Sequence, residues 1–354
     1  MIYIFIHLIL GFFTIVKLKN NNNKIIHSVV FWGLYLFVGL RYEVGADWFN
    51  YLEISNSLSE VDFVAALLIT DPAYAFLNYF SNTIGIDIWL TNSICTIILL
   101  TGLFRFISVT GGLYFPLFIS FPYIIVIVGM GVTRQAAALG LVFIAFIYYR
   151  ESKIQNAYIA LFAAVLFHKT AFIIVLAFSI TKLFEIKKNR LAVYSSSLLV
   201  IICGIILYSK IMDLFHFYND GNYESRGAMI RAIYFFCVAS FAILHRKILF
   251  KNYKEKKMVT ILSGLILLIA PIVYITPVIV DRLLIYFWPI VILVYSRVYY
   301  TKYSIISYFG VIKIVMILSN FIYFYYWIAN SYYYQEHWRN YNNFIIRYIN
   351  SFLF

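Results

Sequence analysis

Four groups of polar residues interrupt long apolar stretches of the sequence, and their side chains could do chemistry. They are Arg41 with Asp47 and Tyr51, Arg134 with Gln135, His168 with Lys169, and Arg282 with Tyr286. An arginine binds phosphate or diphosphate oxygens through two parallel N–H bonds and stays charged. A carboxylate or an imidazole beside it can take a proton from a hydroxyl group. These residue types therefore indicate a site that binds an anion with several oxygens and activates a hydroxyl.

Arg134 is the most costly of these side chains. It is the only charged residue between Tyr114 and Tyr149, and no acidic residue lies near it in the sequence. A guanidinium at the depth of a bilayer costs about 2.5–3.5 kcal/mol. We therefore expect Arg134 to serve function, although an arginine at a helix end can also extend its charge to the membrane surface.

The elements that must position these groups are membrane-spanning helices. Hydrophobic residues make up 63% of the 354 residues and charged residues only 12%, against about 25% charged residues in soluble domains. Twelve apolar segments approach the ~17–25 residues that a span needs. They cover roughly residues 2–17, 26–40, 86–104, 113–130, 134–149, 156–168, 170–183, 191–209, 228–244, 258–277, 282–298 and 304–328. The sequence predicts an all-α polytopic membrane protein with about 12 transmembrane helices in a single integral membrane domain, 1–354.

The distribution of charge predicts which loops face outward. When the loops are numbered alternately, most Lys and Arg residues fall on one side, which is cytoplasmic by the positive-inside rule. Both termini are then periplasmic, with outer loops 41–85 and 210–227 and an outer tail, 329–354. Within the tail, apolar residues at helical spacing from Tyr341 to Phe352 predict a short amphipathic helix on the membrane face. The net charge of +13 reflects this topology, so no nucleic acid partner is expected.

The four polar groups share one predicted depth, near the outer ends of their spans. Helix packing could bring them around one cavity, where two or three guanidinium groups would hold a diphosphate. Such a site fits glycosyl transfer from a polyprenyl-pyrophosphate donor, whose lipid tail stays in the bilayer. Simpler explanations exist for single residues: Arg41 with Asp47, and Arg282 with Asp281, could be local ion pairs. Tyr51 could belong to an aromatic belt at the interface.

Metal and cofactor chemistry is not expected. The three cysteines, Cys95, Cys203 and Cys237, lie singly in apolar stretches, which argues against a disulfide framework or a thiolate metal site. Glu60 and Asp62 have an acid-x-acid spacing that could hold a divalent cation, but so short a match is common by chance. Since no nucleotide-binding fingerprint is present, the energy for transfer would come from an activated donor.

Several short motifs resemble, in order, the EpsG-like group of Wzy-type O-antigen polymerases. They are R-x-x-x-G-x-D-x-x-x-Y from Arg41 to Tyr51, D-P-A-Y from Asp71 to Tyr74, N-Y-F from Asn78 to Phe80, T-R-Q-A from Thr133 to Ala136, L-F-H-K-T-A from Leu166 to Ala171, and Asp281-Arg282 followed by Tyr286. The resemblance covers roughly residues 30–290. Many members carry Ser where this chain has Lys169.

The resemblance implies a membrane glycosyltransferase of GT-C-like architecture, in the bacterial inner membrane with its active site facing the periplasm. It would transfer a growing glycan from undecaprenyl pyrophosphate to the non-reducing end of a lipid-linked repeat unit. Arg134 and Arg282 would hold the pyrophosphate, and Asp47 or His168 would take the proton from the acceptor hydroxyl. Arg41 would orient Asp47 or the donor phosphate. The remaining expected substrate contacts are Gln135, Lys169, Tyr286 and Tyr51.

The expected partners are the lipid-linked glycan donor and acceptor, the lipid bilayer and a chain-length regulator protein. Two other functions use similar substrates. A flippase for lipid-linked sugars would usually keep its site near the membrane midplane, on broken helices related by repeats. No repeat is visible here, and the charges lie at outer helix ends, which favours an enzyme. An O-antigen ligase shares the donor and the arginine chemistry, and the modest loop 210–227 does not decide between the two.

Overall fold

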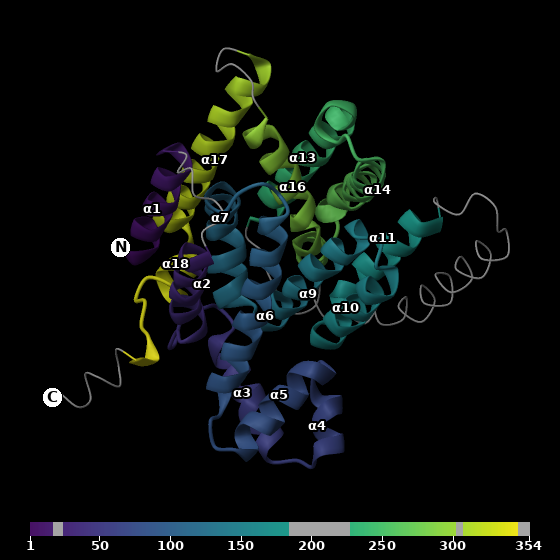
Figure 1. Cartoon of the computed structure of the whole chain (residues 1–354). Coiled ribbons are helices and arrows are strands. Elements are labelled where there is room, and N and C mark those ends of the chain that lie inside the picture. The colour runs from purple at the N-terminus through teal and green to yellow at the C-terminus, as the bar shows by residue number, and fades with distance from the viewer. Residues whose placement is uncertain (17–23, 184–226, 302–306, 346–354) are drawn as a thin grey trace. The chain divides into compact units, whose positions relative to one another are not determined.

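The structure is a computed structural model that describes residues 1–16, 24–183, 227–301 and 307–345 (Figure 1). Every regular element within these ranges is a helix. The chain divides into two compact units, which are described separately. Unit 1 comprises Met1–Lys169 and Tyr295–Phe354, and unit 2 comprises Thr170–Val294.

Six helical segments among the described residues are long and apolar enough to cross a membrane. They are Ile88–Ser108, Tyr114–Gly131, Ala228–Leu249, Tyr253–Tyr274, Pro277–Tyr300 and Tyr308–Asn330. Three shorter apolar helices, Ile2–Val16, Lys24–Gly39 and Ile154–Phe167, coincide with further predicted spans. The chain is therefore an all-α membrane protein. The number of twelve spans, the location of the termini and the GT-C-like architecture stay predictions, and segment 191–209 lies outside the described residues, as does nearly all of loop 210–227.

Unit 1 is built around a tightly packed helix pair. Its longer helical segments are α1 (Ile2–Val16), α2 (Lys24–Gly39), α6 (Ile88–Ser108), α7 (Tyr114–Ser120) continued by η1 (Phe121–Val128) and α8 (Gly129–Gly131), α9 (Thr133–Arg150), α10 (Ile154–Phe167) and α17 (Tyr308–Asn330). A Cβ atom added at Gly102 of α6 would lie 2.0 Å from the carbonyl oxygen of Gly140 in α9. One added at Gly140 would lie 2.4 Å from the carbonyl oxygen of Ile98. The two glycines therefore let the backbones of α6 and α9 touch, as small residues do in membrane helix pairs.

The predicted outer loop 41–85 folds into three short helices, α3 (Trp48–Ser59), α4 (Phe63–Ile69) and α5 (Pro72–Thr83), which gather at one end of unit 1 (Figure 1). Asp62 caps α4 by accepting a hydrogen bond from the amide of Ala65 at 2.9 Å. Asp62, the second acid of the Glu60/Asp62 pair, therefore has a local structural role as a helix cap. Leu58, Ala66 and Ala75 form a small shared core of the three helices.

The C-terminal tail of the described chain is tied to the end of α2. After α18 (Tyr332–His337), Asn343 forms an isolated antiparallel bridge with Arg41, and the amide of Phe344 donates to the carbonyl of Leu40 at 2.8 Å. Tyr341 and Asn342 are therefore not helical, whereas Phe344 and Ile345 are, so that the described part of the predicted amphipathic helix from Tyr341 to Phe352 begins at Phe344. Residues 346–354 lie outside the described chain.

Unit 2 contains α11 (Phe172–Leu183), α13 (Ala228–Leu249), α14 (Tyr253–Ile269) with η3 (Ala270–Tyr274), and α15 (Pro277–Leu284) with η4 (Ile285–Phe287). In sequence, η2 (Lys169–Ala171) and α16 (Trp288–Tyr300) run across the unit boundaries. Arg231 of α13 donates to both carboxylate oxygens of Asp281 in α15, at 2.5 and 2.7 Å. Asp281 thus has an ion-pair partner, Arg231, 50 residues away in the sequence, and the local pair with Arg282 stays a prediction.

Candidate active site

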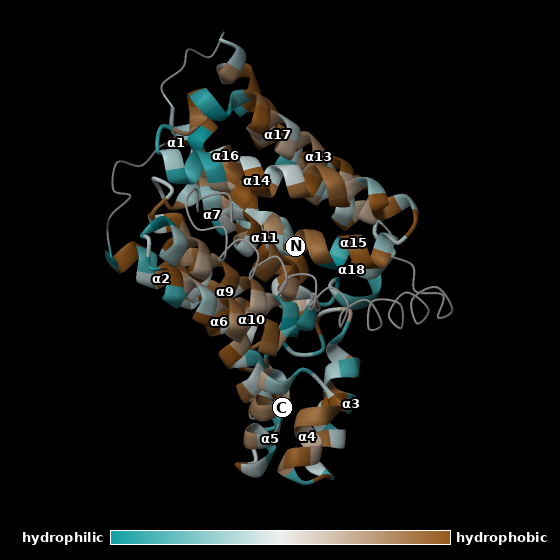
Figure 2. Cartoon of the chain, turned by 90° about the vertical axis from the view of Figure 1, so that its right-hand side faces the viewer, coloured by the Kyte–Doolittle hydropathy of each residue, from teal (hydrophilic) through white to brown (hydrophobic). Residues whose placement is uncertain are grey.

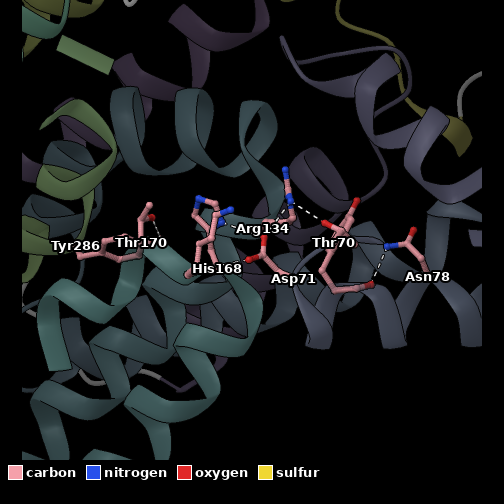
Figure 3. A network of polar contacts seen from close by, with 9 residues as sticks. Thr70, Asp71, Asn78, Arg134, His168, Thr170 and Tyr286 are labelled. Atoms are coloured by element: carbon pink, nitrogen blue, oxygen red, sulfur yellow. Dashed lines mark hydrogen bonds and ion pairs between the residues drawn. The ribbon is translucent and has the colours of Figure 1, made fainter. Parts of the chain in front are cut away.

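Asp71 is the centre of a polar cluster that joins three separate segments of unit 1 (Figure 3). Its Oδ2 atom accepts a hydrogen bond from Nη1 of Arg134 at 2.9 Å and lies 3.1 Å from Nδ1 of His168. Its Oδ1 atom accepts from the backbone amide of Lys169 at 3.2 Å. The carboxylate therefore binds the start of α9 and the end of α10 to the segment between α4 and α5.

Local structure leaves the Asp71 carboxylate available for these contacts. Pro72 occupies the first turn of α5, where its missing N–H is no loss and its fixed φ favours helix. Asp71 stands at the N-cap position, but its side chain makes no capping hydrogen bond to α5. Both carboxylate oxygens can therefore serve residues that are far away in sequence.

Arg134 lies in the first turn of α9, because the chain leaves helical geometry at Val132 and resumes it at Thr133. Its Nη1 atom donates to Thr70 Oγ1 at 2.7 Å as well as to Asp71. The guanidinium carbon lies 5.6 Å from the ring centre of Tyr51 and 5.8 Å from that of Tyr74, within cation–π range. The side chain of Arg134 keeps 24% of its surface exposed, against 7% for Asp71.

The expectation that no acid lies near Arg134 is wrong in three dimensions. Asp71 is 63 residues away in sequence, yet it forms an ion pair with Arg134. The pair compensates a cation that stands at the positive end of the α9 dipole. The Nε–H of Arg134 is buried and has no hydrogen-bond partner in the described part of the chain. An anion could bind the part of the side chain that is exposed, whereas it would reach the buried Nε–H only after the surroundings of Arg134 rearrange.

The electrostatics of Asp71 favour a positioning role. Burial would raise the pKa of its carboxyl group, but the hydrogen bond and charge of His168, the charge of Arg134 and the Lys169 amide together hold that pKa below its ordinary value. A carboxylate with a low pKa is a weak proton acceptor near neutral pH. It is suited to receiving the Nδ1–H of His168, which leaves Nε2 as the basic nitrogen of the imidazole.

His168 and Lys169 contribute different groups. His168 is buried and ends α10 with an extended backbone, which turns its ring toward Asp71. Lys169 contributes its backbone amide to Asp71, whereas its side chain is exposed. The expected substrate contact of the Lys169 ammonium group stays a prediction.

Arg41 is enclosed by protein, with only 1% of its surface exposed. It donates to the carbonyl oxygens of Val38 and Val44 at 2.9 and 3.1 Å and to Thr133 Oγ1 at 2.8 Å. Burial lowers the pKa of Arg41 to about 10, which still leaves it charged at neutral pH. In this conformation Arg41 holds the loop after α2 against the start of α9. A direct contact with a donor phosphate would require this arrangement to open.

Asp47 and Tyr51 lie one helical turn apart at the start of α3. Asp47 is partly exposed, and Nδ2 of Asn50 lies 3.4 Å from its Oδ1 atom. Tyr51 is buried against Arg134, and burial, assisted by the charge of Asp47, raises its pKa to about 12. Gln135, the next residue after Arg134, is also buried. Tyr51 therefore packs directly against the Asp71 cluster, and Asp47 influences it electrostatically.

Gly45 lets the loop between α2 and α3 lie close to the backbone of Met130. Its φ of +110° is one that residues with side chains rarely adopt. A Cβ atom there would lie 2.0 Å from the carbonyl oxygen of Met130, at the end of the segment that leads to Arg134. The backbone conformation and the close contact therefore explain why the Arg41–Tyr51 motif has a glycine at position 45.

Arg282 and Tyr286 belong to unit 2, where Tyr286 is buried and its hydroxyl oxygen lies 3.2 Å from Oγ1 of Thr170. A cavity that Arg282 shares with Arg134 stays a prediction. Sequence reasoning missed Asp71, Thr70, Tyr74 and Arg231 as interacting residues. The D-P-A-Y motif held the signal for Asp71, because an acid directly before a helix-starting proline is free to bind elsewhere.

Comparisons with known proteins place the chain at the level of a family. No curated protein and no solved structure matches the chain. The EpsG family model matches residues 24–349, which include every residue of the Asp71 cluster. This family consists of Wzy-like, polysaccharide polymerase-type membrane proteins. With nearly its whole length matched, and with apolar helices long enough to cross a membrane, the chain belongs to the EpsG family.

Proposed function

We propose that this chain is a polysaccharide polymerase that transfers a growing glycan from undecaprenyl pyrophosphate to the non-reducing end of a lipid-linked repeat unit, at the periplasmic face of the inner membrane. The observation that carries the proposal is the Asp71 cluster. It unites a partly exposed guanidinium with an oriented imidazole, the two groups that diphosphate departure and hydroxyl activation require.

In the proposed reaction, the acceptor hydroxyl oxygen attacks the anomeric carbon of the donor glycan. Nε2 of His168 takes the hydroxyl proton, and Asp71 stabilises the resulting imidazolium through Nδ1. The bond between the anomeric carbon and the diphosphate oxygen breaks, and its electron pair leaves with the diphosphate. Arg134 binds the diphosphate through the exposed part of its side chain, while Thr70 and Asp71 hold Nη1 in place.

Asp47 is the alternative base, because it lies beside Tyr51 and is partly exposed. His168 is preferred, since a neighbouring carboxylate fixes its orientation and tautomer. Arg282 remains the second proposed cation for the diphosphate, and Gln135, Lys169 and Tyr286 remain proposed substrate contacts. Family membership favours a polymerase over a flippase, while a ligase would use the same donor with a different acceptor.

The proposal is tested with purified protein in vesicles that contain only the lipid-linked repeat unit of the host. The wild-type chain should produce a ladder of longer glycans, and Arg134→Ala should not. Arg150→Ala is the matched control, because Arg150 ends the same helix, α9, and among the described residues its side chain donates to the carbonyl of Val109, away from the Asp71 cluster. A wild-type chain that lengthens no glycan until a non-polyprenyl acceptor is added would indicate a ligase. Full-length ladders from normally inserted Arg134→Ala protein would refute the role of Arg134.

A further inference from the structure

The three helices of residues 48–83 have two unlike surfaces. Most exposed residues of α3 and its C-terminal end are polar, among them Glu53, Asn56, Ser57 and Glu60, and Phe49 near its start is the apolar exception. The exposed residues of α4 and α5 are mostly large and apolar. Phe63, Val64, Leu68, Ile69, Phe76 and Phe80 form what is called here the α4–α5 apolar face. Figure 2 shows α4 almost wholly in the hydrophobic colour.

The apolar face is continuous. The rings of Phe63 and Phe76 lie 6.3 Å apart, and those of Phe76 and Phe80 lie 6.5 Å apart in a stacked arrangement. Leu68 leaves 84% of its surface exposed. Apolar patches of this kind on a folded surface mark contacts with protein or membrane.

Charge is absent from this face. Between Phe63 and Ile86 the only charged residue is Asp71, and that carboxylate is buried and paired with Arg134. The charged residues of this helical unit, such as Glu53 and Glu60, stand on or just beyond α3. A surface with apolar residues on one side and acids on the other is amphipathic in the way that interfacial helices are.

The apolar face also leads directly into a membrane span. Ile84 and Ile86 after α5 are exposed, and α6, a candidate span, begins at Ile88. The exposed apolar surface therefore runs without an intervening exposed Lys, Arg or Glu from α4 to the membrane; only Asp87 stands directly before the span. This continuity favours lipid over a protein partner as the group that covers the face.

We propose that the α4–α5 apolar face lies in the lipid leaflet from which α6 begins, while the polar side of α3 faces water. Thr70 and Asp71, which directly follow α4, are then held at the depth of the lipid headgroups. The Asp71 cluster thereby meets the headgroup of a lipid-linked molecule that diffuses in that leaflet. The lipid contact itself does not depend on the proposed reaction.

The test measures the environment of single nitroxide labels on the full chain. Cys95, Cys203 and Cys237 are replaced by alanine, and one cysteine is introduced as Leu68→Cys or Phe76→Cys. Ser57→Cys and Asn56→Cys on α3 are matched controls in the same helical unit. The protein is reconstituted in vesicles of phosphatidylethanolamine and phosphatidylglycerol without polyprenyl lipid. Collision rates with oxygen and with a water-soluble nickel chelate are then compared.

Labels at positions 68 and 76 should collide with oxygen several-fold more than with the nickel chelate, and labels at positions 56 and 57 should show the reverse. Equal nickel access at positions 68 and 57 would overturn the proposal. Protection at position 68 that appears only after undecaprenyl phosphate is added would overturn it in favour of a substrate-chain site. Protection only at a high protein-to-lipid ratio would overturn it in favour of a second copy of the chain.

Discussion

Two guanidinium–carboxylate pairs, one in each unit, use their hydrogen-bonding groups in different ways. In unit 2, Arg231 binds both oxygens of Asp281 with two of its own nitrogens, a two-point geometry that links α13 to α15. In unit 1, Asp71 divides its oxygens among Arg134, His168 and a backbone amide, and only one nitrogen of Arg134 binds it. The first arrangement fixes two helices, whereas the second orients two reactive side chains and leaves part of the arginine for a ligand.

If the two ion pairs differ in this way, the largest effect on activity should come from replacing Arg134. Arg134→Ala should lower the polymerisation rate by about 10²–10³-fold, the usual loss when one donor to a developing oxyanion is removed. Arg231→Ala should change the rate far less in protein that remains folded. Both rates are measured from glycan ladders made by purified, reconstituted protein. Equal losses at the two arginines would remove the distinction between the pairs.

His168→Gln should lower the rate strongly as well, because an amide can keep a hydrogen bond to Asp71 but cannot accept the proton. Asp47→Asn is the companion variant and should retain most of the activity. The rate of each variant is measured at saturating donor concentration, so that weaker binding does not contribute. If Asp47→Asn is inactive while His168→Gln works normally, the base has been assigned to the wrong residue.

The pair in unit 2 should dominate stability instead. Arg231→Ala should destabilise the protein by about 3 kcal/mol, near the lower end for breaking a buried ion pair, because the two side chains are still 18% and 16% exposed. The melting temperature in detergent, read by intrinsic fluorescence, checks this. Replacing both partners, as Arg231→Met with Asp281→Leu, should recover much of the loss, since no charge is then left alone. An unchanged melting temperature for Arg231→Ala would contradict a structural role for the pair.

Gly45→Ala should have an intermediate effect on unit 1. The φ of +110° alone would cost an alanine about 1–3 kcal/mol, and the clash of the added Cβ atom with the backbone carbonyl of Met130 would add to this cost. Gly33→Ala is the control, because nothing lies within 4 Å of a Cβ atom at that glycine. Lower activity and a lower melting temperature are expected for the first variant only.

The smallest effect concerns pH. The pKa of Asp71 is lower in the folded chain than its ordinary value, so its contribution to stability is complete above the unfolded pKa of about 3.9. That contribution is lost as the pH falls further, through the folded pKa. The difference in melting temperature between wild type and Asp71→Asn is compared between pH 5 and pH 3, which lies below the ordinary histidine pKa of about 6.5, and it should shrink below about pH 4. A difference that grows across this window would mean that the carboxyl group is already protonated in the native state.

Much of the fold and part of the site could be predicted from the sequence. Long apolar segments identified the membrane helices, since a bilayer requires helical backbone over about 20 residues. The same patterns identified Arg134 and His168 as unusual, and these two side chains do share a cluster. The patterns could not reveal Asp71 as the common partner, because the depth of a residue in the membrane does not fix its direction around the helix axis. In the tail, periodicity predicted a helix from Tyr341, whereas helical geometry begins only at Phe344, because periodicity does not register backbone partners such as Leu40 and Arg41.

By itself, the sequence determined that this is a helical membrane protein, and it determined which ordered motifs relate it to polysaccharide polymerases. Both follow because hydropathy and the order of motifs can be read along the chain without its three-dimensional structure. The tertiary structure alone decided which distant charges meet: Asp71 with Arg134 and His168, and Asp281 with Arg231. The physical reason in unit 1 is that the close approach of helices, permitted by Gly102 and Gly140 and by the turn at Gly45, selects partners 63 to 97 residues apart.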